Sequence, residues 1–360
     1  MLADASRVTL LTPDTGFPYH ASNMARSASP ALRQWLLFGL LALVWGSSYF
    51  WIKVGVDEGM KPFTLVTLRL AISVVGLTLL MAATRSRITR DRGALTLLVF
   101  LGVVNVALPF GLITWAEQYI GSALASILNA TVPLFVMVFA ALVLHDEPLT
   151  VNRLAGLLIG FAGAVLLLAR HLAPTPGVDP SLAFVGDLAL VAASMAYAVG
   201  GVMIRRFLSG RKLIDDPLTG PRSLRPAEIA LPQNITALVV ISVAAFLFEP
   251  APGGGIVLPT TTAAWVAVTW LGLLGSAVAY LLFYRLLNVW GATRTALVTY
   301  VMPVVGIAMG VLILHETIDA QVVAGTALVI GGIVVINARI GQRKLFGRSP
   351  AVTRVEAAPD

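Results

Sequence analysis

The chain has 360 residues, of which 58% are hydrophobic and only 12% are charged, and its formal net charge is +7 at pH 7. Because soluble domains contain roughly 25% charged residues, this composition excludes an ordinary water-soluble fold and indicates a protein whose main partner is the lipid bilayer. The basic residues stand between long apolar runs instead of on one basic face, which argues against nucleic-acid binding.

Residues 1–33 precede the first apolar run. They are polar, mixed in charge and without apolar periodicity, so we expect a disordered cytoplasmic tail. Met24 is an alternative start, which leaves open whether residues 1–23 belong to the mature protein. The apolar run that follows is longer than the roughly 7–15 residues of a signal-peptide core, and many more such runs come after it. We therefore interpret it as a membrane span.

The rest of the chain is dominated by long apolar stretches. A helix that crosses a bilayer needs about 20 mainly apolar residues, and ten stretches meet this requirement, so we predict an all-α integral membrane protein with ten transmembrane helices. The segment 171–182 separates two halves, 208–225 is rich in charge, Gly and Pro and favours a solvated loop, and 340–360 forms a second tail. The predicted spans are 34–56, 62–84, 94–115, 121–144, 151–170, 183–207, 226–249, 263–287, 291–314 and 321–339.

Lys and Arg are unevenly distributed between the two sides that ten spans define. If both ends of the chain lie on one side, nearly all basic residues fall on that side. Only Lys53, Lys61 and Arg170 fall on or near the other, and Arg69 lies within a span. Connections rich in Lys and Arg mark the cytoplasmic side of a membrane protein. We therefore expect both termini in the cytoplasm.

The two halves of the chain resemble each other. Residues 121–170 match residues 291–339 once a gap of one residue is allowed. Five spans in each copy is an odd number, so the second copy enters the membrane in the opposite orientation, an arrangement that recurs in secondary transporters. We predict two inverted five-helix repeats, at 34–170 and 183–339.

Three stretches carry a resemblance to a known family. The first is WGSSYFWIKVGVDEGMKPFTLVTLRLAIS, from Trp45, and the second is ATVPLFVMVFAALVLHDEPLTVNRLAGLLIGFAGAVLLL in the first copy. The third is VMPVVGIAMGVLILHETIDAQVVAGTALVIGGIVVI in the second copy. Together they resemble the EamA-type carriers of the drug/metabolite transporter superfamily over about 34–339. The resemblance implies a ten-helix inner-membrane carrier, usually an exporter of amino acids or other small metabolites.

Polar and aromatic residues occur at a similar depth near the middle of several spans. A polar group in lipid costs free energy unless it is paired or hydrated, so these positions are candidates for a solute site between the repeats. The alternative is that small polar residues join helices through hydrogen bonds and close approach. The candidate substrate-binding residues are Trp45, Ser48, Asn129, Tyr197, Tyr280 and Tyr300.

Arg69 is the most deeply placed positive charge in the predicted spans. It follows Pro62 by seven residues, which is roughly 10 Å along a helix. An arginine at this depth needs a carboxylate, backbone carbonyls or water as partners. We expect a structural or gating charge, and contact with the carboxylate of an amino-acid-like solute is the alternative.

Proline and glycine positions predict the shape of the helices. Pro133 and Pro303 each remove a backbone donor and are expected to kink their helices. Glycines recur at short spacing in the fifth and tenth spans, which favours close packing of these helices over contact with a substrate. These glycines are Gly156, Gly160, Gly163, Gly325, Gly331 and Gly332.

The carboxylates of the chain avoid the span centres. Glu117 stands at the outer edge of the third span, and Glu228 and Glu249 stand at span ends. Small multidrug carriers related to the resembled superfamily use a glutamate in their first helix for exchange of cations against protons. The first span here has no such residue, which argues against an antiporter of that type.

Signatures of other function classes are absent from the sequence. It contains no cysteine, no phosphate loop, no HExxH or other metal-ligand spacing and no GxSxG motif, so we expect no catalytic residue, no cofactor and no metal. We expect a secondary transporter that moves a small-molecule substrate, an amino acid or similar metabolite, by alternating access, with export as the direction. A channel and a membrane-embedded enzyme are the alternatives. The substrate, the coupling ion and the oligomeric state, including a homodimer, stay open.

Overall fold

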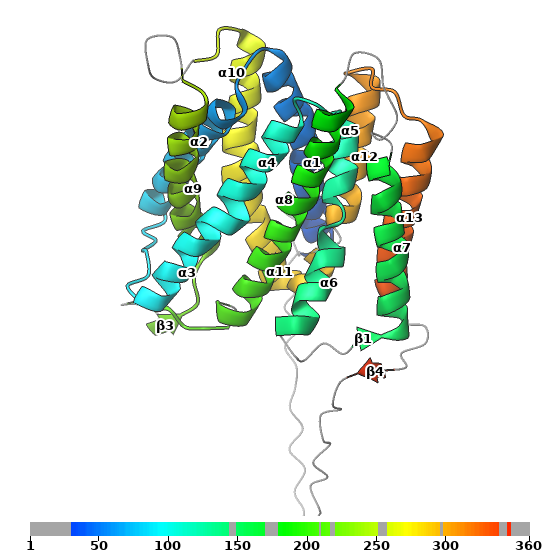
Figure 1. The fold of residues 1–360 in the computed structure, drawn as a ribbon. Coiled ribbons are helices and arrows are strands. Elements are labelled where there is room, and N and C mark those ends of the chain that lie inside the picture. The colour runs from blue at the N-terminus through cyan, green and yellow to red at the C-terminus, as the bar shows by residue number, and fades with distance from the viewer. Residues whose placement is uncertain are drawn as a thin grey trace, which may run out of the picture.

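The computed structural model describes residues 30–143, 149–169, 179–208, 210–216, 220–250, 258–295, 298–337 and 344–346, which are almost entirely helical (Figure 1). The first half contains α1 (Pro30–Asp57), α2 (Pro62–Ala83), α3 (Arg92–Gly102), the π-helical segment η1 (Val103–Ala107), α4 (Leu108–Ala116), α5 (Ser122–Asn129), α6 (Val132–Val143) and α7 (Val151–Leu168). The second half contains α8 (Pro180–Phe207), α9 (Pro226–Phe248), α10 (Thr262–Thr269), the π-helical segment η3 (Trp270–Val278), α11 (Ala279–Thr295), α12 (Val298–Leu312) and α13 (Ala320–Asn337).

Counted as continuous spans, with α3 joined to α4, α5 to α6 and α10 to α11, the helices run roughly antiparallel to their chain neighbours and form one bundle (Figure 1). We call the end at which α1 ends and α2 begins the Lys53 end, which is uppermost in Figure 1. The opposite end, at which α8 ends and α9 begins, is the Arg205 end. Within the described residues, seven helices or joined helices are long and apolar enough to cross a membrane, and three more apolar helices are shorter. The all-helical prediction is therefore confirmed, and the count of ten spans stays a prediction.

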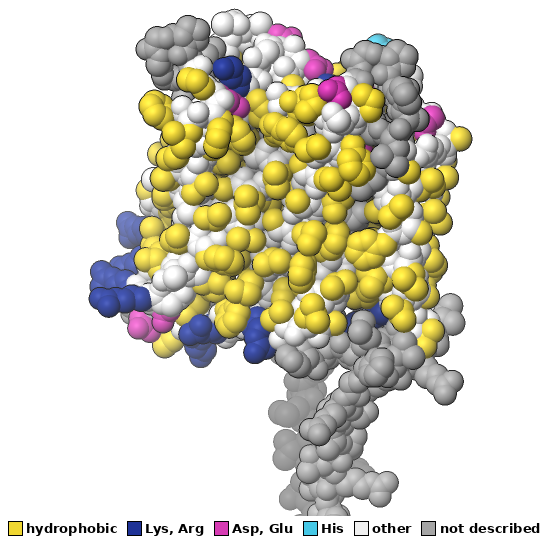
Figure 2. Space-filling view, viewed as in Figure 1, with side chains coloured by type: hydrophobic (Ala, Val, Ile, Leu, Met, Phe, Trp, Pro, Cys, Tyr) yellow, Lys and Arg dark blue, Asp and Glu magenta, His cyan; other side chains and the backbone are white. Residues whose placement is uncertain are grey.

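Large hydrophobic side chains cover the flank of the bundle. Leu312, Phe248 and Leu142 are among the most exposed, and Figure 2 shows apolar side chains along the whole visible flank. Most of the Lys and Arg side chains in that view lie at the Arg205 end. A soluble monomer rarely exposes so large a contiguous apolar surface, so this flank is suited to contact with lipid.

Three predicted boundaries differ from the structure. The helix α1 begins at Pro30, so the last residues of the expected tail 1–33 are helical, and residues 1–29 lie outside the described range. Within the expected tail 340–360, β4 (Lys344–Phe346) pairs antiparallel with β1 (Leu149–Thr150).

The segment 208–225 is also more ordered than the expected solvated loop. Strands β2 (Ile214–Asp216) and β3 (Gly220–Arg222) form an antiparallel pair. Ile214 and Leu224 are buried against Leu98 of α3. The prediction of a solvated loop rested on the high content of charge, Gly and Pro and gave no weight to these few apolar residues. Their burial packs the segment against the bundle.

Two glutamates of the second half cap helices of the first half at the Lys53 end. The Glu249 carboxylate accepts hydrogen bonds from the backbone N–H of Phe63 and Thr64, at 2.8 Å each, and from Thr64 Oγ1 at 2.9 Å. The Glu316 carboxylate accepts from Ser122 N at 2.7 Å, Ser122 Oγ at 2.8 Å and Ala123 N at 2.9 Å. Because the first N–H groups of a helix have no partner within the helix, these carboxylates join the two halves at this end.

The cap at α2 predicts a loss of stability. Replacing Glu249 by Ala leaves three donors at the start of α2 unsatisfied, and loss of such a cap costs about 1–2 kcal/mol. We expect a lower melting temperature of the detergent-solubilised protein. Glu58→Ala changes an exposed glutamate at the same end and should leave the melting temperature unchanged. Equal melting temperatures of the two variants would show that the cap contributes nothing.

Glycines bring α7 and α13 into close contact. A methyl group on Gly163 would lie 2.7 Å from Gly325 O, and one on Gly332 would lie 2.5 Å from Gly156 O. The predicted close packing of these helices is confirmed, because no side chain fits at either position without moving a backbone. Gly331 is an exception to the prediction: a methyl group there meets nothing within 4 Å.

Candidate functional site

A cavity of about 330 Å³ lies within the bundle and is lined by both halves of the chain. At one end it is bounded by Tyr49 and Ile52 of α1, which are buried, and at the other it includes Arg205, which is exposed. The cavity therefore reaches the surface at the Arg205 end. Of the six candidate substrate-binding residues, five line it: Trp45, Ser48, Asn129, Tyr197 and Tyr280. The side chain of the sixth, Tyr300, lies outside the described residues.

Aromatic side chains form one wall of the cavity. The ring of Trp45 stands edge-on to that of Tyr280, with centroids 6.2 Å apart, and tilted to that of Phe283 at 5.3 Å. Tyr280 stacks with Tyr284 at 6.2 Å. Trp45 Nε1 donates a hydrogen bond to Gly275 O at 3.3 Å, which fixes the indole across the two halves. This wall offers apolar faces with polar edges.

Arg69 of α2 brings a positive charge to the cavity. Its side chain is 3% exposed, and its guanidinium lies over the ring of Phe110 at 3.9 Å. Its Nε and Nη2 donate to Ser276 Oγ at 3.3 and 3.2 Å, so within the described residues both hydrogen bonds go to one neutral hydroxyl. Within the described residues, no carboxylate lies at ion-pair distance from Arg69. The described residues that line the cavity include no Asp or Glu. The buried cation thus lacks an anionic partner.

Asn129 ends α5 and presents an acceptor. The residue is 6% exposed, and its buried Oδ1 receives no hydrogen bond from the described residues. A buried amide oxygen left without a donor costs free energy comparable to a lost hydrogen bond. Ser48, in contrast, satisfies its hydroxyl locally by donating to Val44 O at 3.0 Å. Asn129 therefore has more capacity to bind a ligand than Ser48 has.

Two π-helical segments shape the cavity, one from each half. η1 contributes Asn105 and η3 contributes Gly275. A π-turn inserts an additional residue and rotates the helix face that follows, and such segments are frequent at functional sites. In η3, Ser276 Oγ bonds back to Leu271 O at 2.9 Å and holds the hydroxyl toward Arg69. The sequence gives no periodic signal for either segment.

The two prolines expected to kink their helices lie in different settings, and a kink at Pro303 stays a prediction. Before Pro133 the helix is interrupted at residues 130–131, so α5 and α6 are separate helices. Pro303 lies inside α12, which continues through it. The interruption leaves Asn129 at a helix end, where its side chain reaches the cavity.

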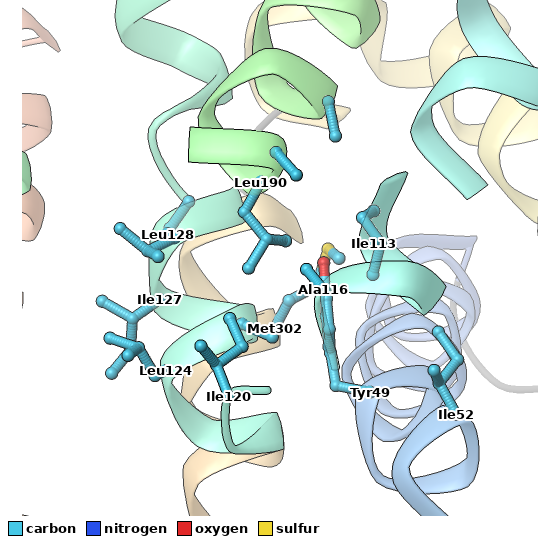
Figure 3. Packing of buried hydrophobic residues seen from close by; sticks show 14 of the residues in the cluster. Tyr49, Ile52, Ile113, Ala116, Ile120, Leu124, Ile127, Leu128, Leu190 and Met302 are labelled. Carbon is cyan, nitrogen blue, oxygen red and sulfur yellow. The ribbon is translucent and has the colours of Figure 1, made fainter. Parts of the chain in front are cut away.

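An apolar cluster closes the cavity toward the Lys53 end. Tyr49 and Ile52 of α1, Ile113 and Ala116 of α4, and Met302 of α12 meet there (Figure 3). Ile120 and Leu124 extend the cluster away from the cavity toward the start of α5. The caps made by Glu249 and Glu316 lie at the same end. The cavity is therefore open at one end of the bundle and sealed at the other.

Comparison with known proteins identifies the family. The sequence model described as the EamA-like transporter family matches the chain twice, over residues 33–169 and 184–338. The chain belongs to the EamA-like transporter family. As a member with many apolar helices, it is a multi-pass membrane protein.

Relatives of this EamA-like chain carry transporter names. An uncharacterized transporter of Bacillus subtilis, YoaV, is 23% identical over 86% of this chain and 99% of its own length. The uncharacterized inner membrane transporter YedA of Escherichia coli K12 is 26% identical over 89% of this chain and 95% of its own. A probable amino-acid metabolite efflux pump of Salmonella typhimurium is 24% identical over 82% of this chain and 92% of its own length. The family and relatives thus point to a transporter instead of an enzyme.

A solved structure supports the fold. One crystal structure superposes with a TM-score of 0.57 at 21% identity, covering 85% of this chain and 97% of the other. At this identity the likeness concerns the fold alone. In the described part of the EamA-like chain, no three His, Cys, Asp or Glu side chains are grouped so as to hold a metal ion.

Several cavity residues were not among the sequence-derived candidates. Asn105 and Phe110 line the site, and Ser276 binds Arg69 beside it. Asn105 and Ser276 are polar residues near the middle of the third and eighth spans, at the depth expected for a solute site, but they were not selected as candidates, and Phe110 carries no such signal. Asn105 Nδ2 donates to Gln233 Oε1 at 3.3 Å, which ties η1 to α9. Neither periodicity nor the repeat separates these residues from polar residues that only join helices.

Proposed function

We propose that this protein is a secondary transporter for a small amphipathic metabolite with a carboxylate, an amino acid or close analogue, and that it works by alternating access. The observation that carries this proposal is the Arg69 guanidinium, which is buried at the cavity and has no anionic partner among the residues that the structure describes. A buried charge is stable only when it is paired and hydrogen-bonded. An anionic group of the substrate supplies that pair.

The acceptor of Asn129 supports a zwitterionic substrate. Its Oδ1 lacks a donor and lines the same cavity as Arg69. An ammonium group has three donors and no acceptor, so it suits this oxygen. The aromatic wall of Trp45, Tyr280 and Phe283 suits an apolar side chain. The name of the Salmonella relative, a probable amino-acid metabolite efflux pump, agrees with this substrate class.

The transport cycle follows from the two halves. We propose ten spans in two inverted repeats, 34–170 and 183–339, with the solute site between them and both termini in the cytoplasm. The two matches of the family model support the repeats. In this orientation the Arg205 end faces the cytoplasm, so the cavity has the access expected of an inward-open exporter. The apolar seal at the Lys53 end favours a carrier over an open channel.

Substrate exchange in proteoliposomes tests this proposal. We expect purified protein to catalyse counterflow of radiolabelled apolar amino acids such as leucine and phenylalanine. Phenethylamine, which lacks the carboxylate, and 3-phenylpropionate, which lacks the ammonium group, separate the two expected contacts. Both should compete at least about tenfold more weakly than phenylalanine, since each lost charge-assisted contact costs about 1.5–3 kcal/mol.

Two results of this experiment would contradict the proposed substrate class. If phenethylamine competes as well as phenylalanine, the site does not select a carboxylate, and Arg69 is not its ligand. If no amino acid exchanges while an unrelated solute does, the substrate class is wrong. Vesicles without protein are the control for leakage.

A further inference from the structure

Glu117 is a buried carboxyl group that no contact satisfies. It directly follows α4, is 0% exposed, and both of its carboxyl oxygens lack a hydrogen-bond partner in the described part of the chain. Two other glutamates at the same end, Glu249 and Glu316, each accept three hydrogen bonds. The difference excludes a capping role for Glu117.

The ammonium group of Lys53 lies next to Glu117 but contacts other groups. Lys53 Nζ donates to the backbone oxygen of Glu117 at 3.2 Å, not to its carboxyl group, and pairs with Asp57 Oδ1 at 3.0 Å. The other groups whose charge acts on Glu117 are Arg69 of α2 and Glu316, which follows α12. Other titratable groups on neighbouring elements are Tyr49 of α1, on which the charge of Glu117 acts, and Tyr197 and the buried Asp187 of α8. Asp187 follows Gly186, which lies beside Ala116.

A carboxylate ion in this environment is costly. Burial of a charged group without hydrogen-bond donors disfavours the ionised form, and the group responds by binding a proton. Glu117 lies beyond the apolar span Arg92–Ala116. Burial raises the pKa of its carboxyl group well above the usual range, Glu316 and Asp57 raise it further, and Lys53 and Arg69 partly oppose this shift. In the conformation described here, burial therefore favours the neutral acid more than it does at an exposed glutamate.

Glu117 stands beside the seal of the cavity. Ala116 and Ile120, one residue before it and three after it, belong to the apolar cluster that closes the Lys53 end, together with Tyr49 of the cavity wall (Figure 3). Opening of this end would separate the cluster and admit water to the carboxyl group. Hydration would return the pKa toward its ordinary value and release the proton.

We propose that Glu117 is the proton-binding site of this transporter, and that protonation of Glu117 stabilises the conformation in which the Lys53 end is closed. This inference rests on the proposed alternating-access function. A metal cation is a poorer occupant, because hard cations require six or more oxygen ligands, and this site offers two oxygens next to an ammonium group. The proton therefore provides the coupling ion that the sequence leaves open.

The sign of the pH dependence follows from linkage. The closed conformation binds the Glu117 proton more tightly than the open one, so it gains stability as pH falls and loses it as pH rises. The closed-to-open ratio changes by up to about tenfold for each unit by which the Glu117 pKa differs between the conformations. The Lys53 end should therefore open more often at pH 8 than at pH 5.5.

Cysteine accessibility measures this equilibrium directly. The chain has no native cysteine, so Ile120→Cys introduces a single thiol within the seal. In proteoliposomes of the full chain, we expect its labelling rate by a membrane-impermeant thiol reagent to fall at least about tenfold from pH 8 to pH 5.5. The rate is divided by that of Glu58→Cys, an exposed position at the same end, which removes the pH dependence of the thiol itself.

Variants at the carboxyl group decide the assignment. Glu117→Gln imitates the protonated acid, so labelling of the Ile120→Cys thiol should be slow and independent of pH. Glu58→Gln removes an exposed carboxylate at the same end and should keep the pH dependence. Glu117→Asp retains a titratable group, so its profile should persist with a shifted midpoint. That variant decides the test alone if the Gln variant fails to fold.

Two results would overturn the proposal: a normalised labelling rate that does not change with pH in the Glu117 protein, or a pH profile left unchanged by Glu117→Gln or Glu117→Asp. Neither result bears on the carrier function, which counterflow at constant pH measures separately. Absence of counterflow with an intact labelling profile would instead contradict the proposed substrate class.

Discussion

Replacing Arg69 by Gln should abolish transport while leaving the protein as stable as before or more stable. Truncation of one partner in a buried, hydrogen-bonded charge pair costs about 2–5 kcal/mol, so exchange of an amino acid should fall at least about 30-fold. Among the described residues the guanidinium has no such pair, because it is buried and its hydrogen bonds there go to a serine hydroxyl alone. Removal of an unpaired buried charge relieves a desolvation cost, so the melting temperature should stay or rise.

Opposite effects on activity and stability distinguish a ligand-binding charge from a structural one. Ser276→Ala removes the hydroxyl that holds the guanidinium and leaves the charge, so we expect a loss of about fivefold, corresponding to one neutral hydrogen bond of about 1 kcal/mol. Arg69→Lys keeps the positive charge but lacks the planar guanidinium, so its transport rate should lie between those of Arg69→Gln and Ser276→Ala. Counterflow in proteoliposomes and thermal unfolding of the same preparations are the measurements. Normal exchange by Arg69→Gln, or a large drop in its melting temperature, would return Arg69 to the structural or gating role.

From the sequence, the depth of the cavity residues in the membrane could be predicted better than the side of the helix on which their side chains lie. Trp45, Asn129 and Tyr280 were selected because they stand near the middle of their spans, and depth follows from counting residues along a helix. Whether a side chain faces the cavity depends on helix rotation. The π-helical segments η1 and η3 change that rotation locally, so Ser276 and Asn105 were not selected as candidates although they are polar residues near the middle of predicted spans.

Glu117 shows a different limit of sequence reasoning. From its position at the edge of a span, it was grouped with Glu249 as a carboxylate at a helix end. The structure separates them, because Glu249 meets the start of a helix from the other half of the chain, whereas Glu117 meets an apolar cluster. Contacts between halves depend on how the halves dock, and local sequence carries no information about that.

Replacing Gly332 by Leu should prevent correct assembly of the bundle. A single methyl group at this position already lies 2.5 Å from Gly156 O and from Gly160 N, and both are backbone atoms that no rotamer change can move. The helices α7 and α13 must therefore separate, and without a hydrophobic driving force in lipid their association depends on such close packing. We expect a destabilisation beyond the roughly 1–3 kcal/mol of ordinary overpacking.

Gly331 provides the matched control, because it is the preceding residue of the same helix and a methyl group there meets nothing within 4 Å. Gly331→Leu adds the same side chain to the same helix and replaces a poor helix former, which favours the helix by up to about 1 kcal/mol. Size-exclusion profiles of detergent extracts and melting temperatures should show aggregated or absent protein for Gly332→Leu and a normal peak for Gly331→Leu. If the two variants behave alike, the contact between α7 and α13 does not decide assembly. If only Gly332→Leu fails, these helices form the scaffold that holds the cavity helices in place, as expected from their absence among the described residues that line the cavity.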